Sequence, residues 1–225
     1  MNDQNPINPI PPVVTVLVLI IVGVEAVLSM AGQGWIGGPQ GVGWRLAAIE
    51  DYGVWAAVFD WIVTRGDYSP DLLIRFVTYP FIHGSITHAI FGAALLLALG
   101  KFVGDVFHPV SVLLVFFVSA IAGGLVYAAL LGSDQPLYGV YPPVYGLIGA
   151  FTYLMWLRLG AVGANQYRAF LLIGLLLGWQ LLTGVLFGGS PQWVADVTGF
   201  VAGLGLAPLV GPGGWAAFLR RIRTR

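Results

Sequence analysis

Charge and cysteine are both scarce in this chain of 225 residues. Only 9% of the residues are charged, ten acidic and ten basic, whereas a soluble domain carries about 25%. Hydrophobic residues make up 58% of the chain, which excludes a soluble enzyme and a disordered chain because a soluble sphere could not cover so much apolar surface. The few cations form no basic face, so a nucleic-acid partner is excluded as well. Without cysteine, disulfides, thiolate nucleophiles and thiolate metal sites are absent.

Long apolar runs are what the chain has instead. Six stretches reach the roughly 20 residues that a membrane-spanning helix needs. They cover about residues 12–31, 81–104, 109–131, 142–160, 167–187 and 191–210. We expect the first run to be a span rather than a signal peptide, because no Lys or Arg precedes it. The sequence therefore predicts an all-α polytopic membrane protein with six transmembrane helices, forming one integral membrane domain over residues 1–225.

The cations predict the orientation of these spans, because cytoplasmic segments are enriched in Lys and Arg. Placing the N-terminus in the cytoplasm puts seven cations inside: Lys101, Arg158, Arg168, Arg220, Arg221, Arg223 and Arg225. The other three lie in one long first loop, about residues 32–78, which is rich in aromatic residues and is expected to be partly interfacial. We therefore expect a short cytoplasmic N-terminal segment and a basic cytoplasmic tail at residues 220–225.

Ionisable residues inside spans are costly and usually functional. Of the ten acidic residues, only Glu25 and Asp196 fall clearly inside a predicted span. His83 and His88 open the second run, but their spacing of five differs from the i, i+4 spacing of a two-histidine metal site. We therefore expect no metal and no cofactor.

Four short motifs give the chain a family resemblance. The motifs are Phe81-x-His83-x4-His88-x3-Gly92, Gly139-x-Tyr141-x4-Gly146-x2-Gly149, Ala195-Asp196-x2-Gly199-x3-Gly203 and the pair Trp44-Arg45. With the first three motifs in this order along the chain, the Trp44-Arg45 pair in the first loop, six spans and a long outer first loop, the chain resembles the rhomboid family of intramembrane serine proteases. The resemblance covers about residues 40–210 and implies a rhomboid-like bundle in which the glycines of the motifs pack helices closely. For such a protein we expect the inner membrane of a bacterium.

The departures from the family pattern fall on its catalytic positions. Tyr141 stands where the family has its nucleophilic serine, Asp196 where it has the catalytic histidine, and Gly92 where it has an oxyanion-binding asparagine. His83 and His88 are retained, the latter at a position that assists the oxyanion hole in active members. The resemblance therefore implies that no catalytic residue is intact.

Chemistry supports the same interpretation. A phenol titrates near 10 in water and is a poor nucleophile. An imidazole accepts a proton at one nitrogen while the other nitrogen is held in place, whereas a carboxylate has only one functional end and is a weak base in water. Pro142 and Pro143 also remove two N–H donors from the start of the fourth span. We expect the Tyr141 hydroxyl to donate a hydrogen bond to Asp196. In the alternative, Asp196 faces a water-filled cavity and pairs with His88.

Three functions remain open from the sequence. The leading hypothesis is a rhomboid pseudoprotease that binds the transmembrane segments of client proteins, by analogy with inactive members of the family. The alternatives are a divergent but active intramembrane serine endopeptidase and a small transporter that uses Glu25 and Asp196. The predicted partners are the lipid bilayer and transmembrane clients.

Overall fold

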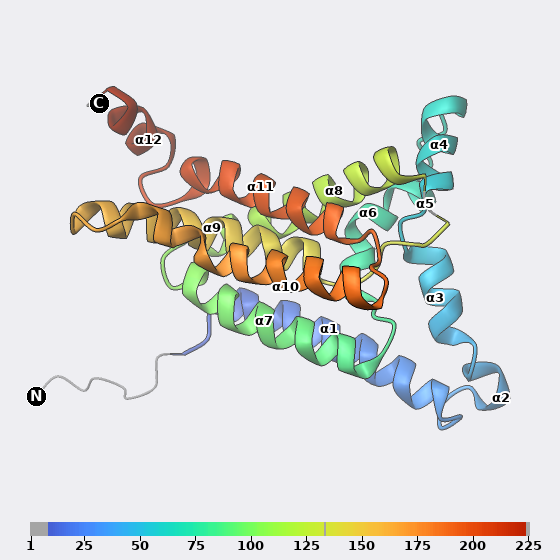
Figure 1. Ribbon diagram of the computed structural model, residues 1–225. Helices are drawn as coiled ribbons and strands as arrows, with labels where there is room; N and C mark the ends of the chain where they lie inside the picture. Colours follow the sequence, from blue (N-terminus) through green and yellow to red (C-terminus); the bar gives the residue numbers. More distant parts are fainter. Residues whose placement is uncertain (1–8, 133, 224–225) are drawn as a thin grey trace, which may run out of the picture.

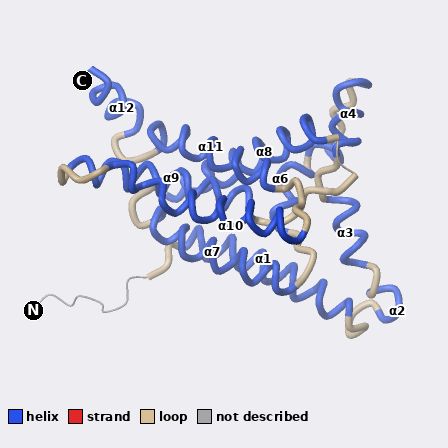
Figure 2. Tube along the Cα trace, in the orientation of Figure 1, coloured by secondary structure: helices blue, strands red, loops and turns tan. Residues whose placement is uncertain are grey.

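Six long helices form the body of the molecule in a computed structural model, which describes residues 9–132 and 134–223 (Figure 1). All six are long and apolar enough to cross a membrane. They are α1 (Pro12–Gly32), α7 (Ile86–Gly104), α8 (Pro109–Leu131), α9 (Tyr141–Ala161), α10 (Leu171–Phe187) and α11 (Trp193–Val210). A 3₁₀ turn, η2 (Gln166–Phe170), comes directly before α10 and continues its span. Within the described residues there is no strand, only an isolated bridge between Val54 and Leu137 (Figure 2). The predicted all-α, six-span fold is confirmed.

The long first loop is a string of short helices at the end of the bundle away from the termini (Figure 1). These are α2 (Gly38–Gly41), α3 (Trp44–Tyr52), α4 (Ala56–Arg65), α5 (Pro70–Leu73), α6 (Arg75–Thr78) and the 3₁₀ turn η1 (Tyr79–Phe81). Most of this loop is exposed, but Ile62, Phe76 and Tyr79 are buried in a cluster with α8 residues. The Tyr79 hydroxyl donates to the Ala120 carbonyl of α8 at 2.9 Å and fixes the end of the loop to the bundle.

The second span begins later than the sequence predicted. The Ser85 hydroxyl accepts a hydrogen bond from the His88 N–H at 3.2 Å and caps α7, so the helix starts at Ile86 and not at residue 81. Ser85 is thus a helix cap. His83 consequently lies in the extended segment before the helix, outside the span.

Close helix packing concentrates on α9, which lies against α7, α8 and α11. A Cβ atom at Gly199 would overlap the Pro142 backbone, and one at Gly203 would overlap the Gly146 backbone. Glycine at these positions therefore lets α9 and α11 approach until their backbones touch, which is how helices associate in lipid. By contrast, α10 buries only Ile173 and lies at the periphery of the bundle (Figure 1).

A final helix, α12 (Gly214–Arg223), follows α11 at the end of the bundle where the described chain also begins (Figure 1). It carries Arg220, Arg221 and Arg223 of the predicted basic tail. Residues 224–225 of that tail, and residues 1–8 of the predicted N-terminal segment, lie outside the described part of the chain.

Candidate functional site

A cavity of about 280 Å³ lies among α7, α9, α10 and α11. Its lining includes His88, Tyr141 and Asp196, so the fold brings these three predicted site residues to one place. Tyr145 and Gln180, which the sequence analysis did not single out, also line it.

Asp196 is held by a glutamine and not by the partners predicted for it. Its side chain is buried, with a relative exposure of 4%, in the first turn of α11. Gln180 Nε2 of α10 donates to Asp196 Oδ2 at 2.9 Å, and the Tyr145 hydroxyl donates to Gln180 Oε1 at 3.4 Å. Asp196 Oδ1 has no hydrogen-bond partner among the described residues. Neither the predicted hydrogen bond from Tyr141 nor the alternative pair with His88 forms among the described residues, although Asp196 does border a cavity, as the alternative expected.

Tyr141 packs against a histidine instead. Its ring stacks on the His88 ring with centroids 5.1 Å apart and an interplanar angle of 13°. His88 in turn meets His83 edge to face at 5.1 Å and Tyr138 at 6.0 Å. The aromatic face of Tyr141 is thus used in packing, and its hydroxyl is not engaged by a base.

His83 supports the segment that leads into α9. The ring is buried, and Nε2 accepts a hydrogen bond from the Val140 N–H at 3.4 Å. Burial, and the neighbouring His88 to a smaller degree, lower the pKa of His83 from 6.5 to about 4, so the ring is neutral near pH 7. This agrees with its role as a hydrogen-bond acceptor.

The start of α9 offers few donors for an oxyanion. Pro142 and Pro143 carry no N–H group. The Gly139 N–H already donates to the Tyr79 carbonyl at 3.0 Å, and the Val140 N–H donates to His83. An anion at this helix start would therefore find fewer free N–H groups than an ordinary helix N-terminus presents.

The position of the family's asparagine is closed by packing. Gly92 is buried, and a Cβ atom there would lie 2.5 Å from Val140 Cγ1. An asparagine at residue 92 would require Val140 to move.

Glu25, which the sequence left without a role, pairs with Arg45 of the first loop. Arg45 Nη2 donates to Glu25 Oε1 at 2.7 Å and Nη1 donates to Oε2 at 2.9 Å. Arg45 Nη1 also donates to the His83 carbonyl at 2.6 Å, and Ser29 donates to Glu25 Oε1 at 2.7 Å. This bidentate pair connects α1, α3 and the segment that contains His83. The neighbouring Trp44 side chain is 39% exposed. Glu25 therefore makes no carboxylate pair with Asp196.

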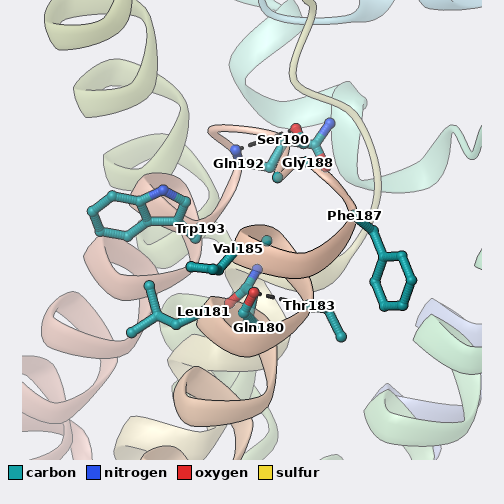
Figure 3. Close-up of a pocket in the computed structure, with 11 residues that line it drawn as sticks. Gln180, Leu181, Thr183, Val185, Phe187, Gly188, Ser190, Gln192 and Trp193 are labelled. Atoms are coloured by element: carbon teal, nitrogen blue, oxygen red, sulfur yellow. Dashed lines mark hydrogen bonds between the residues drawn. The ribbon is translucent and has the colours of Figure 1, made fainter.

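A second cavity of about 430 Å³ adjoins the first at the C-terminal end of α10. Figure 3 shows Gln180 and Thr183 on α10, with Ser190 and Gln192 on the loop that leads to α11. Gln180, Thr183 and Gln192 line both cavities, so the two meet at these side chains. Among the described residues, no group of three or more His, Asp or Glu side chains could hold a metal ion.

Gln180 and Tyr145 are site residues that sequence reasoning missed. A glutamine in a largely apolar span is itself a signal, because a polar side chain in the membrane needs a partner. The sequence does not predict which residue is that partner, because Asp196 lies 16 residues from Gln180 and on a different helix.

Comparison with known families agrees with the arrangement of these elements. The family model for the rhomboid domain matches residues 70–213, which include α7 to α11 and the cavity. A comparison with curated proteins finds no match. With six apolar helices and a rhomboid domain over more than half of its length, the chain is an integral membrane protein that belongs to the rhomboid family.

Proposed function

We propose that this rhomboid is a pseudoprotease, catalytically inactive, that binds the transmembrane segments of client proteins. The observation that carries the proposal is the Gln180–Asp196 hydrogen bond. It occupies the position where the resemblance places a catalytic histidine, while Tyr141 is stacked on His88. Acyl transfer requires a nucleophile in hydrogen-bond contact with a base, and this pair is not formed. In a soluble serine protease, loss of nucleophile and base together costs on the order of 10⁶ in rate.

The donors for an oxyanion are reduced in the same place. Removing one such donor costs about 10²–10³ in kcat in a soluble protease. Here Gly92 has no side-chain amide, and the two prolines have no N–H group. Residual catalysis from this site should accordingly be small.

The face proposed for client binding is the exposed side of α10. Leu175, Leu182 and Val185 are 51% to 85% exposed on this helix, whose own contacts with the bundle are slight. In lipid, helices associate by close packing and by polar contacts. A client helix could therefore pack beside α10, within reach of the polar side chains that Gln180 and Thr183 present at the two cavities.

The membrane placement of this proposal follows the charges. We place both termini in the cytoplasm of a bacterium, within one integral membrane domain whose rhomboid-like core covers about residues 40–210. The described termini lie at one end of the bundle, and Lys101 reaches the Pro9 carbonyl there at 3.2 Å (Figure 1). Six spans and a cationic end support a cytoplasmic location for that end.

A fluorophosphonate probe tests the loss of activity. The purified protein should not be labelled at any serine, with an active rhomboid labelled in parallel as the positive control. Labelling of the unmodified protein would contradict the proposal.

Site-specific photo-crosslinking tests the client face. A crosslinker at Val185 of α10 should capture a single-span transmembrane peptide in proteoliposomes. The matched control is Val201 of α11, an equally apolar residue that is 60% exposed. Equal capture from both positions would show non-specific collision in the bilayer and would contradict the assignment.

A further inference from the structure

We propose that the cavity beside Asp196 binds a small organic ammonium group, of the size of choline. The inference goes beyond the proposed function because it uses only the cavity and does not require client binding at α10. It rests on three features of the cavity: its aromatic lining, its buried carboxylate and its size.

Several aromatic side chains border the cavity of about 280 Å³. Tyr138, Tyr145 and Trp179 are among its lining residues, and so is Tyr141, whose ring is stacked on His88. Organic cations are attracted to the faces of such rings, and cages of aromatic residues are the common solution for quaternary ammonium groups. No Lys or Arg is among the residues that line the cavity, which include His88, so the lining does not favour an anion.

The carboxylate supplies the charge that such a cage needs. Asp196 borders the cavity, is almost fully buried and is held by a single neutral donor, Gln180. No Lys or Arg within residues 9–132 and 134–223 forms an ion pair with it. A buried carboxylate without a cation is costly, and an ammonium group in the cavity would offset that cost.

The dimensions and the approach set the class of ligand. A volume of about 280 Å³ is slightly below the range of about 300–1,000 Å³ that holds drug-sized ligands, so a small head group fits. Asp196 Oδ1 is covered, so the ammonium group must approach along the side where Gln180 now donates. Gln180 also borders the second cavity, which makes its carboxamide the group that must turn for the ligand to enter.

Calorimetric titration of the full-length protein in a non-ionic detergent tests the proposal with choline as the probe. We expect saturable binding, and no binding of 3,3-dimethylbutan-1-ol, which has the same shape without the charge. Equal binding of the two compounds would overturn the proposal, as would the absence of choline binding in both detergent and lipid.

Two variants test the residues. Asp196→Asn should weaken choline binding by about tenfold or more, whereas the same exchange at the exposed Asp71 should leave it unchanged. Because Asp196→Asn could unfold the protein, Trp179→Leu serves as a second variant on a residue that is 67% exposed. It should weaken binding by about two- to fivefold, since one aromatic contact with a cation is worth about 0.5–1 kcal/mol at an exposed site. Unchanged affinity in Trp179→Leu and in folded Asp196→Asn would refute the site.

Lipid nanodiscs separate the two sources of the ligand. In phosphatidylglycerol nanodiscs, free choline should bind as in detergent. Suppression of that binding in phosphatidylcholine nanodiscs identifies a lipid head group as the natural ligand, and equal binding in both identifies a water-soluble ammonium compound. Either result supports an ammonium site.

Discussion

The substitution Arg45→Met removes the cation of the Glu25 pair and keeps an unbranched apolar side chain of about the length of the arginine's aliphatic stem. The Arg45 side chain is 23% exposed and that of Glu25 is 6% exposed, so the carboxylate would stay buried with only the Ser29 hydroxyl as partner. Breaking a buried pair by removing one partner costs about 3–5 kcal/mol. Because Arg45 is partly exposed, we expect the low end, about 3 kcal/mol, which lowers the midpoint of thermal unfolding by roughly 6–12 °C in a chain of this length.

A double-mutant cycle isolates the pair from the other effects of the substitution. Thermal unfolding in detergent is measured for Arg45→Met, Glu25→Gln and the double variant, and the two single effects should exceed the double effect by about 2 kcal/mol. Arg65→Met is the matched control, because Arg65 lies over the Trp61 ring at 3.8 Å and should cost under about 1 kcal/mol. Additivity of the two single effects to within about 0.5 kcal/mol would refute the argument that this pair ties the first loop to α1.

Three further predictions concern the site and its orientation. Gln180→Leu leaves the Asp196 carboxylate without its hydrogen bond, so it should destabilise the protein by about 1–3 kcal/mol in detergent; an unchanged unfolding midpoint would contradict this. Burial lowers the pKa of His83 from 6.5 to about 4. As the pH falls, this histidine is therefore protonated in the unfolded chain at a higher pH than in the folded protein. Its contribution of about 3 kcal/mol is present above pH 6.5 and is lost as the pH falls to 4, so the acid-induced drop in unfolding midpoint should be smaller in His83→Gln than in the parent. Because the chain has no cysteine, a membrane-impermeant maleimide should label Asp71→Cys in intact cells but label Arg223→Cys only after permeabilisation; the reverse pattern would invert the proposed topology.

The six spans were predictable because each one is a long apolar run, which is visible in the sequence. The start of the second span was not, because apolar residues continue back to Phe81 while Ser85 caps the helix. The glycines of α9 and α11 carried the signal for close packing in their spacing.

The partners of the two buried carboxylates were not predictable. Glu25 pairs with Arg45 across 20 residues, and Asp196 accepts from Gln180 across 16, so neither lies within a local periodicity. The resemblance to a protease implied that Asp196 and Tyr141 face each other, whereas the structure pairs Asp196 with Gln180. The structure turns the Tyr141 ring onto His88, because an aromatic ring at that helix start can stack on the imidazole.

We propose that this rhomboid does not cleave peptides, and an assay for cleavage of a transmembrane substrate in proteoliposomes decides the matter. The purified protein is reconstituted with a labelled single-span substrate, with an active rhomboid as the positive control and protein-free liposomes as the blank. We predict product at the level of the blank for the unmodified chain. Cleavage above the blank that is abolished by Asp196→Ala, in a variant shown to remain folded, would contradict the claim.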